Sequence, residues 1–329
     1  MIFSNNNFGI VSNDFLNRKY ISYANLGSIV TNLGNTPIDS TAIDETKEIS
    51  FLKCYHEHLE RKQIGFQVGL SQKINVLNYI DKNIYSIDKS DFGYGYSDMF
   101  GKVDTTGTAS GLKSQEIIEV AILELIEKNE MLLFWYLQKG EYVKKDTFIK
   151  KIISDMGFSS DRVEIFTCQE ISNYFVFFVV LIDQNTVIAS GAGISNNQIN
   201  ALKKALSEAR LLEWQNKNNK MSSLYMMDLS EKEKVINYLD NLIKVLPIKE
   251  IRNNKVHSLV IVDWVESIYI NVLNPLNDYS SLTIKCISRE LYNCLPLKDN
   301  IVKSLNKKIS IKYRLSLESL ESIPDCILK

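Results

Sequence analysis

The longest uninterrupted apolar segment of the chain is "YFVFFVVLI", which spans residues 174–182. Its length and its content of aromatic and β-branched residues predict a buried strand, because a helix that crosses a bilayer needs about 20 apolar residues. Residues 161–168, "DRVEIFTC", predict a second strand that pairs with the first. We therefore expect a sheet in which residues 174–183 are centrally buried.

Elsewhere, segments with helical and strand periodicity are mixed without a regular order. Helices are expected at 45–66, 114–136, 198–216 and 231–246, and further strands at 255–265, 267–274 and 281–288. A doubly wound sheet would alternate strands and helices regularly, so this order favours the α+β class with a mixed sheet and long helices.

The composition is that of an ordinary globular protein, with 329 residues, 45% hydrophobic and 23% charged, and a formal net charge of −1. This balance indicates no general attraction to nucleic acid or to a membrane. The five cysteines are widely spaced and include no CxxC pair, which indicates reduced thiols rather than disulfides or a zinc site. The first residues lack the pattern of a signal peptide, so we expect a cytoplasmic protein.

Two segments share one plan. Residues 103–127, "VDTTGTASGLKSQEIIEVAILELIE", and residues 187–213, "VIASGAGISNNQINALKKALSEARLLE", each predict a strand, a turn of small residues and then a helix that carries glutamate. The two segments are either a weak internal repeat or two independent strand–turn–helix units, and the sequence leaves both open.

The helix predicted at 114–136 places one glutamate in an unfavourable position. At about 100° per residue, Glu124 lies between Ile117 and Met131 in the apolar sector, and Glu127 lies at the edge of the polar face. The polar face itself comprises Glu116, Glu119, Leu123 and Glu130. A buried carboxylate needs a partner, so Glu124 either forms a salt bridge, for instance with Lys128, or binds a metal ion.

Two further helices carry glutamates. Glu57 and Glu60 lie on the polar face of the helix near residue 50, beside Arg61, and Glu208 follows the second small-residue turn. Solvated helix faces and i,i+4 pairs such as Lys204 with Glu208 are the simpler explanation. Carboxylates that converge with the amides of glycine turns suit Mg²⁺ and the phosphates of a nucleotide. Neither a Walker A sequence nor a strand-bound GxGxxG is present, which argues against the common nucleotide-binding folds.

Three motifs in the chain resemble those of the YcaO-type ATP-dependent enzymes, which modify peptide backbones. They are "KCYHEHLERKQ" (53–63), "GTASGLKSQEIIEVAILELIEKNEMLLFWYL" (107–137) and "GAGISNNQINALKKALSEARLLEW" (191–214), and they occur in the family's order. The likeness covers most of residues 25–215, and "SLTIKCISRELYNCLPL" (281–297) resembles the family loosely. Within the family, the chain is most similar in character to the stand-alone YcaO subunit of microcin B-type synthetases.

The resemblance implies an ATP-dependent cyclodehydratase that forms azolines in a bacteriocin-like, ribosomally made peptide. ATP and Mg²⁺ are the implied cofactors, with Glu124 and Glu127 as catalytic residues. The implied metal ligands are Glu57, Glu60, Glu124, Glu127 and Glu208. The implied nucleotide contacts are Gly107, Thr108, Ala109, Ser110, Gly111, Glu208 and Arg61, with the turn at 191–193 nearby.

The resemblance also implies an organisation and partners. We expect a single YcaO-like domain over 1–329, with a nucleotide-site core at 25–215 and a C-terminal portion at 216–329. The implied partners are a ThiF-like or other leader-peptide-binding protein, the precursor peptide and a flavin-dependent dehydrogenase, and the chain itself is expected to form a homodimer. Nucleic acid and membrane are not expected partners.

The chain departs from the family pattern at several positions. Lys128 stands where the second motif usually has Arg, and Leu211 and Glu213 replace the expected Gln and Arg of the third. The last residues, "SIPDCILK", lack the Pro-rich tail of many azoline-forming members. Two alternatives therefore stay open: an enzyme that forms a thioamide or amidine, and a catalytically silent scaffold subunit of a synthetase.

Overall fold

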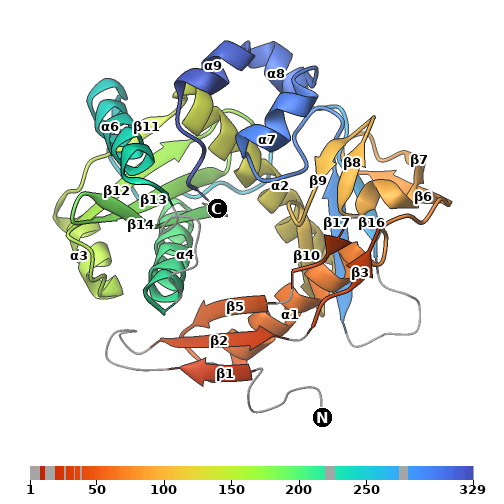
Figure 1. Ribbon diagram of the computed structural model, residues 1–329, viewed down its shortest axis with the longest axis horizontal. Helices are drawn as coiled ribbons and strands as arrows, with labels where there is room; N and C mark the ends of the chain where they lie inside the picture. The colour runs from red at the N-terminus through yellow and green to blue at the C-terminus, as the bar shows by residue number, and fades with distance from the viewer. Residues whose placement is uncertain are drawn as a thin grey trace. The chain divides into compact units, whose positions relative to one another are not determined.

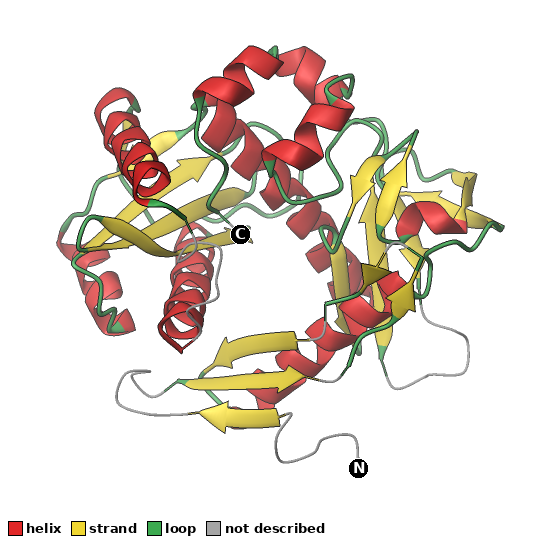
Figure 2. Ribbon diagram, viewed as in Figure 1, coloured by secondary structure: helices red, strands yellow, loops and turns green. Residues whose placement is uncertain are grey.

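The structure is a computed structural model of the chain. It describes residues 8–11, 19–25, 27–32, 34–37, 39–218, 227–273 and 281–328. These residues form two compact units whose segments are interleaved along the sequence. Unit 1 comprises the described residues up to 128 together with 263–273 and 281–312, and unit 2 comprises 129–218, 227–262 and 313–328. Both units combine helices with sheets, which confirms the predicted α+β class (Figure 2).

Unit 1 contains a three-stranded and a five-stranded sheet (Figure 1). The first has the order β1-β2-β5, with strands Phe8–Val11, Tyr20–Asn25 and Asp39–Asp44. The second has the order β10-β17-β16-β6-β7, with strands Thr108–Gly111, Leu282–Ile287, Tyr269–Val272, Lys73–Asn78 and Ile84–Asp88. Unit 1 also contains two short strand pairs. Strand β3 (Val30–Thr31) pairs with β4 (Gly34–Asn35), and strand β8 (Gly95–Ser97) pairs with β9 (Gly101–Val103).

Helix α1 (Lys47–Gly65) links the two sheets of unit 1, since it packs on β2, β5 and β10. The hydroxyl of Thr46 accepts a hydrogen bond from the amide of Ile49 and so caps the helix. Helix α2 (Ser114–Leu137) begins in this unit directly after β10. The shorter helices of the unit are η2 (Lys89–Phe92), α7 (Lys298–Ile301), η3 (Val302–Ser304) and most of α8 (Lys308–Tyr313).

Unit 2 is built on a five-stranded sheet of order β14-β13-β12-β11-β15. Its strands are Thr186–Ser195, Phe175–Asp183, Arg162–Cys168, Glu141–Val143 and Ile248–Lys249. All pairs are antiparallel except β11 with β15, so the sheet is mixed, as predicted. The helices are the second half of α2, α3 (Thr147–Met156), α4 (Gln198–Asn218), α6 (Leu229–Val245) and α9 (Leu317–Ser322).

The apolar run in β13 is explained by burial on both faces of the sheet. Phe177 and Val179 point into a core formed with α3 and α4. Phe178 points to the opposite face, where its ring stacks on Phe134 of α2 at a centroid distance of 5.0 Å. Because successive side chains of a strand point to opposite faces, a strand covered on both sides has no polar position. The predicted central strand and its pairing with β12 are confirmed.

The turn of small residues predicted between the strand and the helix of 187–213 is wrong at 191–193, because residues 187–195 form most of strand β14. A Cβ atom on Gly191 would lie 2.3 Å from both the carbonyl oxygen of Ala205 and the amide nitrogen of Ala209, and Gly193 is equally close to α4. The glycines therefore allow helix α4 to lie directly against the strand, and they do not mark a bend.

We expect Gly191→Ala to lower the free energy of unfolding by about 3 kcal/mol or more, because helix backbone occupies the space that the new methyl group needs. Gly111→Ala is the matched control, since its Cβ would meet the side chain of Ile117 at 3.1 Å, which can move. Chemical denaturation of both variants measures the difference. Equal stability of the two variants would contradict the close packing of α4 on β14.

Two other expectations also need correction. The predicted strand at 255–265 forms only isolated bridges, at Lys255 and Ile261. Glu130 and Leu123, placed by the helical wheel on the polar face of α2, are both buried, whereas Glu116 and Glu119 are exposed as predicted. The wheel fails at Glu130 because residues 125–136 of α2 are all buried, so this part of the helix has no solvent face.

The last described residues of the chain are part of the core of unit 2. Cys326, Ile327 and Leu328 are buried. The indole nitrogen of Trp135 donates to the carbonyl oxygen of Pro324 at 2.8 Å, and the hydroxyl of Ser190 on β14 donates to that of Ile327 at 2.9 Å. This segment therefore fixes the end of α2 to the edge strand of the sheet.

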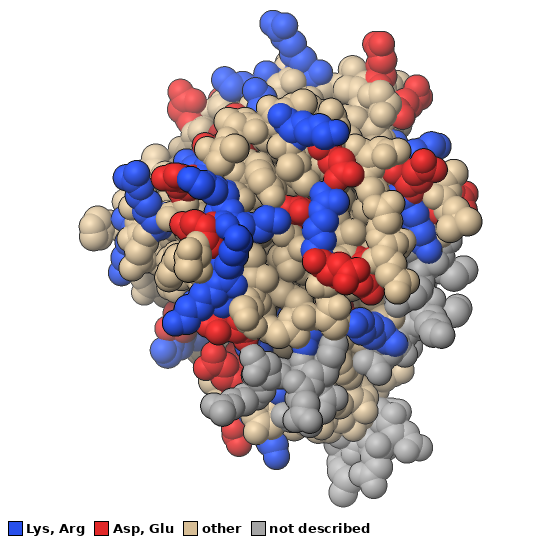
Figure 3. All heavy atoms as spheres, turned by 90° about the vertical axis from the view of Figure 1, so that its left-hand side faces the viewer, with Lys and Arg blue, Asp and Glu red and all other residues tan. Residues whose placement is uncertain are grey.

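The surface shown in Figure 3 carries interspersed acidic and basic side chains. Ion pairs of Lys144 with Glu250 and of Lys249 with Glu141, both at 2.9 Å, join opposite charges near β11 and β15. All five cysteines are buried, and none of them forms a disulfide. Among the described residues, no helix is long and apolar enough to cross a membrane.

Candidate active site

Strand β10 positions the first candidate ligand, Glu124 of α2. The amides of Gly107 and Thr108 donate to its Oε2 atom at 3.1 and 3.0 Å. Gly107 has φ +78°, and a Cβ atom there would lie 2.6 Å from the carbonyl oxygen of Cys286, so the turn before β10 requires glycine. No described residue donates a hydrogen bond to Oε1, which leaves that oxygen for a ligand.

The same strand positions the second candidate, Glu60 of α1. The amide of Ser110 donates to Glu60 Oε1 at 2.8 Å, and no described residue donates to Oε2. Two glutamates from different helices are thus fixed by neighbouring amides of one edge strand. This arrangement brings Glu60 and Glu124 to the same strand, and each keeps one carboxylate oxygen for another partner. Their role as metal ligands, which the family resemblance implies, stays a prediction.

Glu57 and Arg61 form an adjoining group on α1. The guanidinium of Arg61 donates to Glu57 Oε1 at 2.6 Å and to Asp39 Oδ1 at 3.1 Å, and the amide of Thr41 donates to Glu57 Oε2 at 2.7 Å. Both oxygens of Glu57 are therefore occupied. Its role as a metal ligand, and that of Arg61 as a nucleotide contact, stay predictions that require these contacts to change.

The electrostatics of Glu60 and Glu124 are those of carboxylates that lack a cation. Burial raises the pKa of Glu124 to about 7, against the opposing fields of Lys128 and Lys285. Burial also raises the pKa of Glu60 well above its usual value, and the charges of Glu124 and Glu57 add to this effect. Close carboxylates in a desolvated site repel each other, and a bound cation would relieve both the burial cost and the repulsion.

These pKa values predict how stability depends on pH. A carboxyl group whose pKa is higher in the folded than in the unfolded protein loses stabilising free energy as pH rises from the unfolded to the folded pKa. For Glu124 this window runs from about 4.5 to about 7. Without Mg²⁺, we expect Glu124→Gln to gain stability relative to the wild type across the window, by up to about 3 kcal/mol. Denaturation curves at pH 4.5 and 7.5 measure it, and a pH-independent difference would contradict the raised pKa.

Glu127 is held differently from Glu124. It is buried, and Lys128 Nζ donates to its Oε1 atom at 2.9 Å. The salt bridge that the sequence offered as an explanation for Glu124 is therefore formed with Glu127. The metal-binding and catalytic roles expected for Glu127 stay predictions.

Glu208 belongs to unit 2, where it repeats the contact of Glu124. The amide of Ala192 on β14 donates to Glu208 Oε2 at 2.8 Å, as the amide of Thr108 on β10 donates to Glu124 Oε2. Helices α2 and α4 begin at 114 and 198, so the two starts and the two contacts are each offset by 84 residues. This common geometry favours the internal repeat over two independent units. The ligand role of Glu208 stays a prediction.

The segment 107–111 forms a turn at Gly107 followed by strand β10, and it is not a free glycine loop. Three of its amides, those of Gly107, Thr108 and Ser110, donate to carboxylates of the site. The amides therefore orient the candidate ligands. Direct contacts of residues 107–111, including Ala109, with a nucleotide stay predictions.

The donor set fits Mg²⁺ that also binds a phosphate. Within the described parts of the chain, no group of three or more His, Cys, Asp or Glu side chains is arranged to hold a metal ion alone. Mg²⁺ in nucleotide sites usually takes one or two carboxylates and completes its shell with water and phosphate oxygens. The hydroxyls of Thr106 and Thr108 are also buried without a described hydrogen-bond partner. A bound ligand with oxygen acceptors would satisfy them.

Sequence reasoning missed Lys285, which is completely buried on β17 beside Thr108. Its Nζ atom donates to the carbonyl oxygens of Asp104 and Thr106 at 2.6 and 2.5 Å. Burial lowers the pKa of Lys285, while its charge helps to lower that of Glu124. The signal was a lysine in the mainly apolar strand segment 282–287, because a buried ammonium needs partners.

The fold and this site define a class of protein with an acidic site suited to a Mg²⁺-bound phosphate compound. The family model described as YcaO cyclodehydratase, ATP- and Mg²⁺-binding, matches residues 88–280, more than half of the chain. The chain belongs to the YcaO family. ATP and Mg²⁺ are thus the cofactors of its family, as the sequence predicted. A comparison with curated protein sequences gives no match.

Solved structures share the fold at low sequence identity. YcaO from Methanopyrus kandleri, bound with AMPPCP and Mg²⁺, is 11% identical with a TM-score of 0.68, over 87% of this chain and 87% of that one. A chain of the E. coli microcin synthetase McbBCD complex is 12% identical with a TM-score of 0.64, over 93% and 94% of the two chains. A chain of that complex with pro-MccB17 bound is 14% identical with a TM-score of 0.60, over 86% and 88%.

Proposed function

We propose that the chain is the ATP-dependent cyclodehydratase subunit of a peptide-modifying synthetase. It would form azolines from Cys, Ser or Thr residues of a ribosomally made precursor peptide. The observation that carries this proposal is the pair Glu60 and Glu124, each fixed by amides of β10 through one oxygen and open at the other. The family to which the chain belongs, described as ATP- and Mg²⁺-binding, supports the same function.

In this reaction the side chain of the peptide's Cys, Ser or Thr attacks the preceding backbone carbonyl carbon. When bound, ATP with Mg²⁺ supplies the phosphoryl group that carries the carbonyl oxygen away as phosphate. Glu60 and Glu124 would hold the cation, and the charge of Lys285 would favour the ionised form of Glu124. A catalytic role of Glu124 beyond binding the cation stays a prediction.

The partners follow from the same proposal. We infer a leader-peptide-binding protein, ThiF-like or of another type, and a precursor peptide, because the structural matches include a chain of a synthetase complex with and without pro-MccB17. A flavin-dependent dehydrogenase that oxidises azolines to azoles and a homodimer of the chain remain expectations from the sequence.

A reconstitution experiment tests the function. The chain is incubated with its leader-binding partner, a precursor rich in Cys, Ser and Thr, ATP and Mg²⁺. Cyclodehydration predicts that the peptide loses the mass of one water molecule per ring and that one phosphate is released per ring. A peptide of unchanged mass would contradict the proposal. A mass change that corresponds to a thioamide or amidine would assign the chain to those reactions.

One observation favours a second candidate, a catalytically silent scaffold subunit. Glu213, which stands where the third family motif is expected to have Arg, is completely buried and forms an ion pair with Arg210. It also accepts hydrogen bonds from the amide and hydroxyl of Ser159 at 3.0 and 2.7 Å. Glu213 therefore stabilises unit 2, and this position offers no positively charged side chain to a bound nucleotide. A silent subunit would bind the partner but leave the peptide unchanged.

A further inference from the structure

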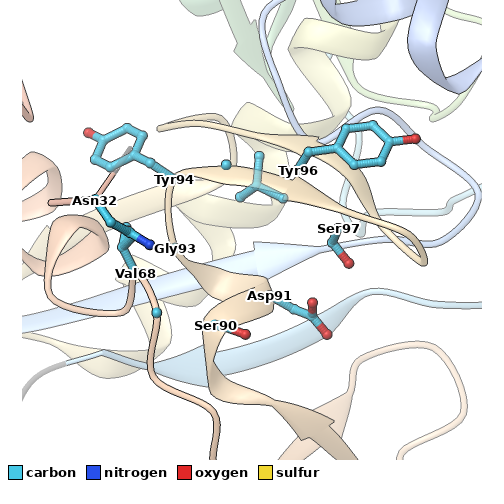
Figure 4. Close-up of a pocket in the computed structure, with 11 residues that line it drawn as sticks. Asn32, Val68, Ser90, Asp91, Gly93, Tyr94, Tyr96 and Ser97 are labelled. Atoms are coloured by element: carbon cyan, nitrogen blue, oxygen red, sulfur yellow. The ribbon is translucent and has the colours of Figure 1, made fainter. Parts of the chain in front are cut away.

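Unit 1 contains a polar cavity of about 150 Å³ that no step of the proposed reaction uses. Helix η2, the segment Gly93–Tyr94 and strand β8 form its walls, with Val68 and Asn32 at one side (Figure 4). Because a protein cavity of about this volume holds a molecule the size of benzene, the space suits the end of one side chain better than a nucleotide.

Asp91 is the one charged side chain that lines this cavity. Its carboxylate lies beside the hydroxyl of Ser97 and forms no ion pair with any described lysine or arginine. Burial raises the pKa of Asp91, and the charges of Asp88 and Asp98 add to this effect against that of Lys73. A carboxylate in this position repels anions and gains free energy from a cation that enters the cavity.

The geometry favours an organic cation over a metal ion. As noted above, no group of three or more potential ligand side chains among the described residues is arranged for a metal. Apart from two valines, the other lining residues are Asn32, four residues with hydroxyls and three glycines. Their amide, hydroxyl and carbonyl oxygens can accept hydrogen bonds from the several N–H donors of an ammonium or guanidinium group. A lysine or arginine side chain combines these donors with a stem long enough to reach Asp91.

Two features connect the cavity with a peptide and with the candidate active site. Strand β8 pairs with β9 alone among the described strands, so its outer edge can receive an extended peptide by strand addition. Tyr94 lines the cavity, yet its hydroxyl points away from Asp91 (Figure 4). The charges of Glu60, Glu57 and Arg61 act on that hydroxyl, which places Tyr94 between the cavity and the carboxylates of the site.

We propose that this cavity is a subsite for a lysine or arginine side chain of the substrate peptide, with Asp91 as its counter-ion and Ser97 as a second acceptor. The proposal rests on the proposed function, since it assigns a substrate feature to the same site. It predicts that the enzyme prefers peptides with a basic residue near the modified Cys, Ser or Thr.

The test uses the full chain and capped hexapeptides that differ only at one central position, which is Arg, Lys, Gln or Glu. Fluorescence anisotropy without ATP should show the Arg and Lys peptides binding at least tenfold more tightly than the Gln peptide. Asp91→Asn should abolish that preference. Asp98→Asn, which changes an exposed carboxylate outside the cavity lining, should keep it within about twofold.

Equal binding of the Arg and Gln peptides, or a preference that survives Asp91→Asn, would overturn the subsite. Displacement of the Arg peptide by millimolar Mg²⁺ or Ca²⁺ through Asp91 would also overturn it and would indicate a metal site. Because the assay contains no ATP, its outcome is independent of the reconstitution experiment. If the chain prefers the Arg peptide in the binding assay but leaves the precursor unmodified in the reconstitution, the cyclodehydratase proposal is wrong and the peptide subsite stands.

Discussion

Glu60→Gln and Glu124→Gln should each lower the ATP-dependent reaction rate by about 100-fold or more while the chain stays folded. Glutamine keeps an oxygen that accepts the amide hydrogen bonds from β10, so the local structure is preserved. What is lost is one negative charge opposite the cation, and electrostatic stabilisation of this kind contributes several kcal/mol to phosphoryl transfer. Phosphate release with partner and peptide at saturating ATP measures the effect.

Glu116→Gln is the matched control for these variants. Glu116 lies on the same helix as Glu124, but it is exposed and pairs with Lys113 at 2.8 Å. The reaction rate of the Glu116→Gln variant should stay within about twofold of the wild-type rate. A normal rate for both Glu60→Gln and Glu124→Gln, with circular dichroism unchanged, would show that these two carboxylates stabilise the structure and do not bind Mg²⁺.

Glu130→Ala should destabilise unit 2 by about 3 kcal/mol or more. The carboxylate of Glu130 is completely buried and accepts hydrogen bonds from the amides of Glu170, Ile171 and Ser172, the closest at 2.6 Å. Removal of the carboxylate leaves buried amides without an acceptor, and each costs about 1–3 kcal/mol. Glu130→Gln retains one acceptor oxygen and should lose less stability. Chemical denaturation of both variants tests this order, and an unchanged midpoint for Glu130→Ala would contradict it.

Segments with a long apolar run or a clear helical period were predicted well from the sequence. The strand at 174–183 and the helices near 114–136, 198–216 and 231–246 match β13, α2, α4 and α6 closely. In these segments the apolar pattern alone determines which structure buries the side chains. The meeting of Glu60 with Glu124 was predicted by the family resemblance, because no local pattern relates residues that far apart in the chain.

The errors occurred where contacts distant in sequence decide the structure. The glycines in 187–197 predict a turn, but in the structure they let helix α4 pack against a strand. The sequence pattern places Glu130 on the surface, but its carboxylate is buried and accepts hydrogen bonds from three loop amides. Lys285 has the pattern of an exposed strand residue, but its ammonium group donates to the carbonyl oxygens of Asp104 and Thr106. In each case the deciding group lies many residues away, so periodicity carries no information about it.

The most direct test of the account is a calorimetric titration of the full chain with ATP, with and without Mg²⁺. We expect binding that requires Mg²⁺, that weakens by at least tenfold in Glu124→Gln and that is unchanged in Glu116→Gln. We also expect Mg²⁺–ATP to displace protons as the raised pKa of Glu124 falls. Binding of equal strength in Glu124→Gln, or the absence of Mg²⁺-dependent binding in the wild type with its partner present, would contradict the assignment of a nucleotide site to these carboxylates.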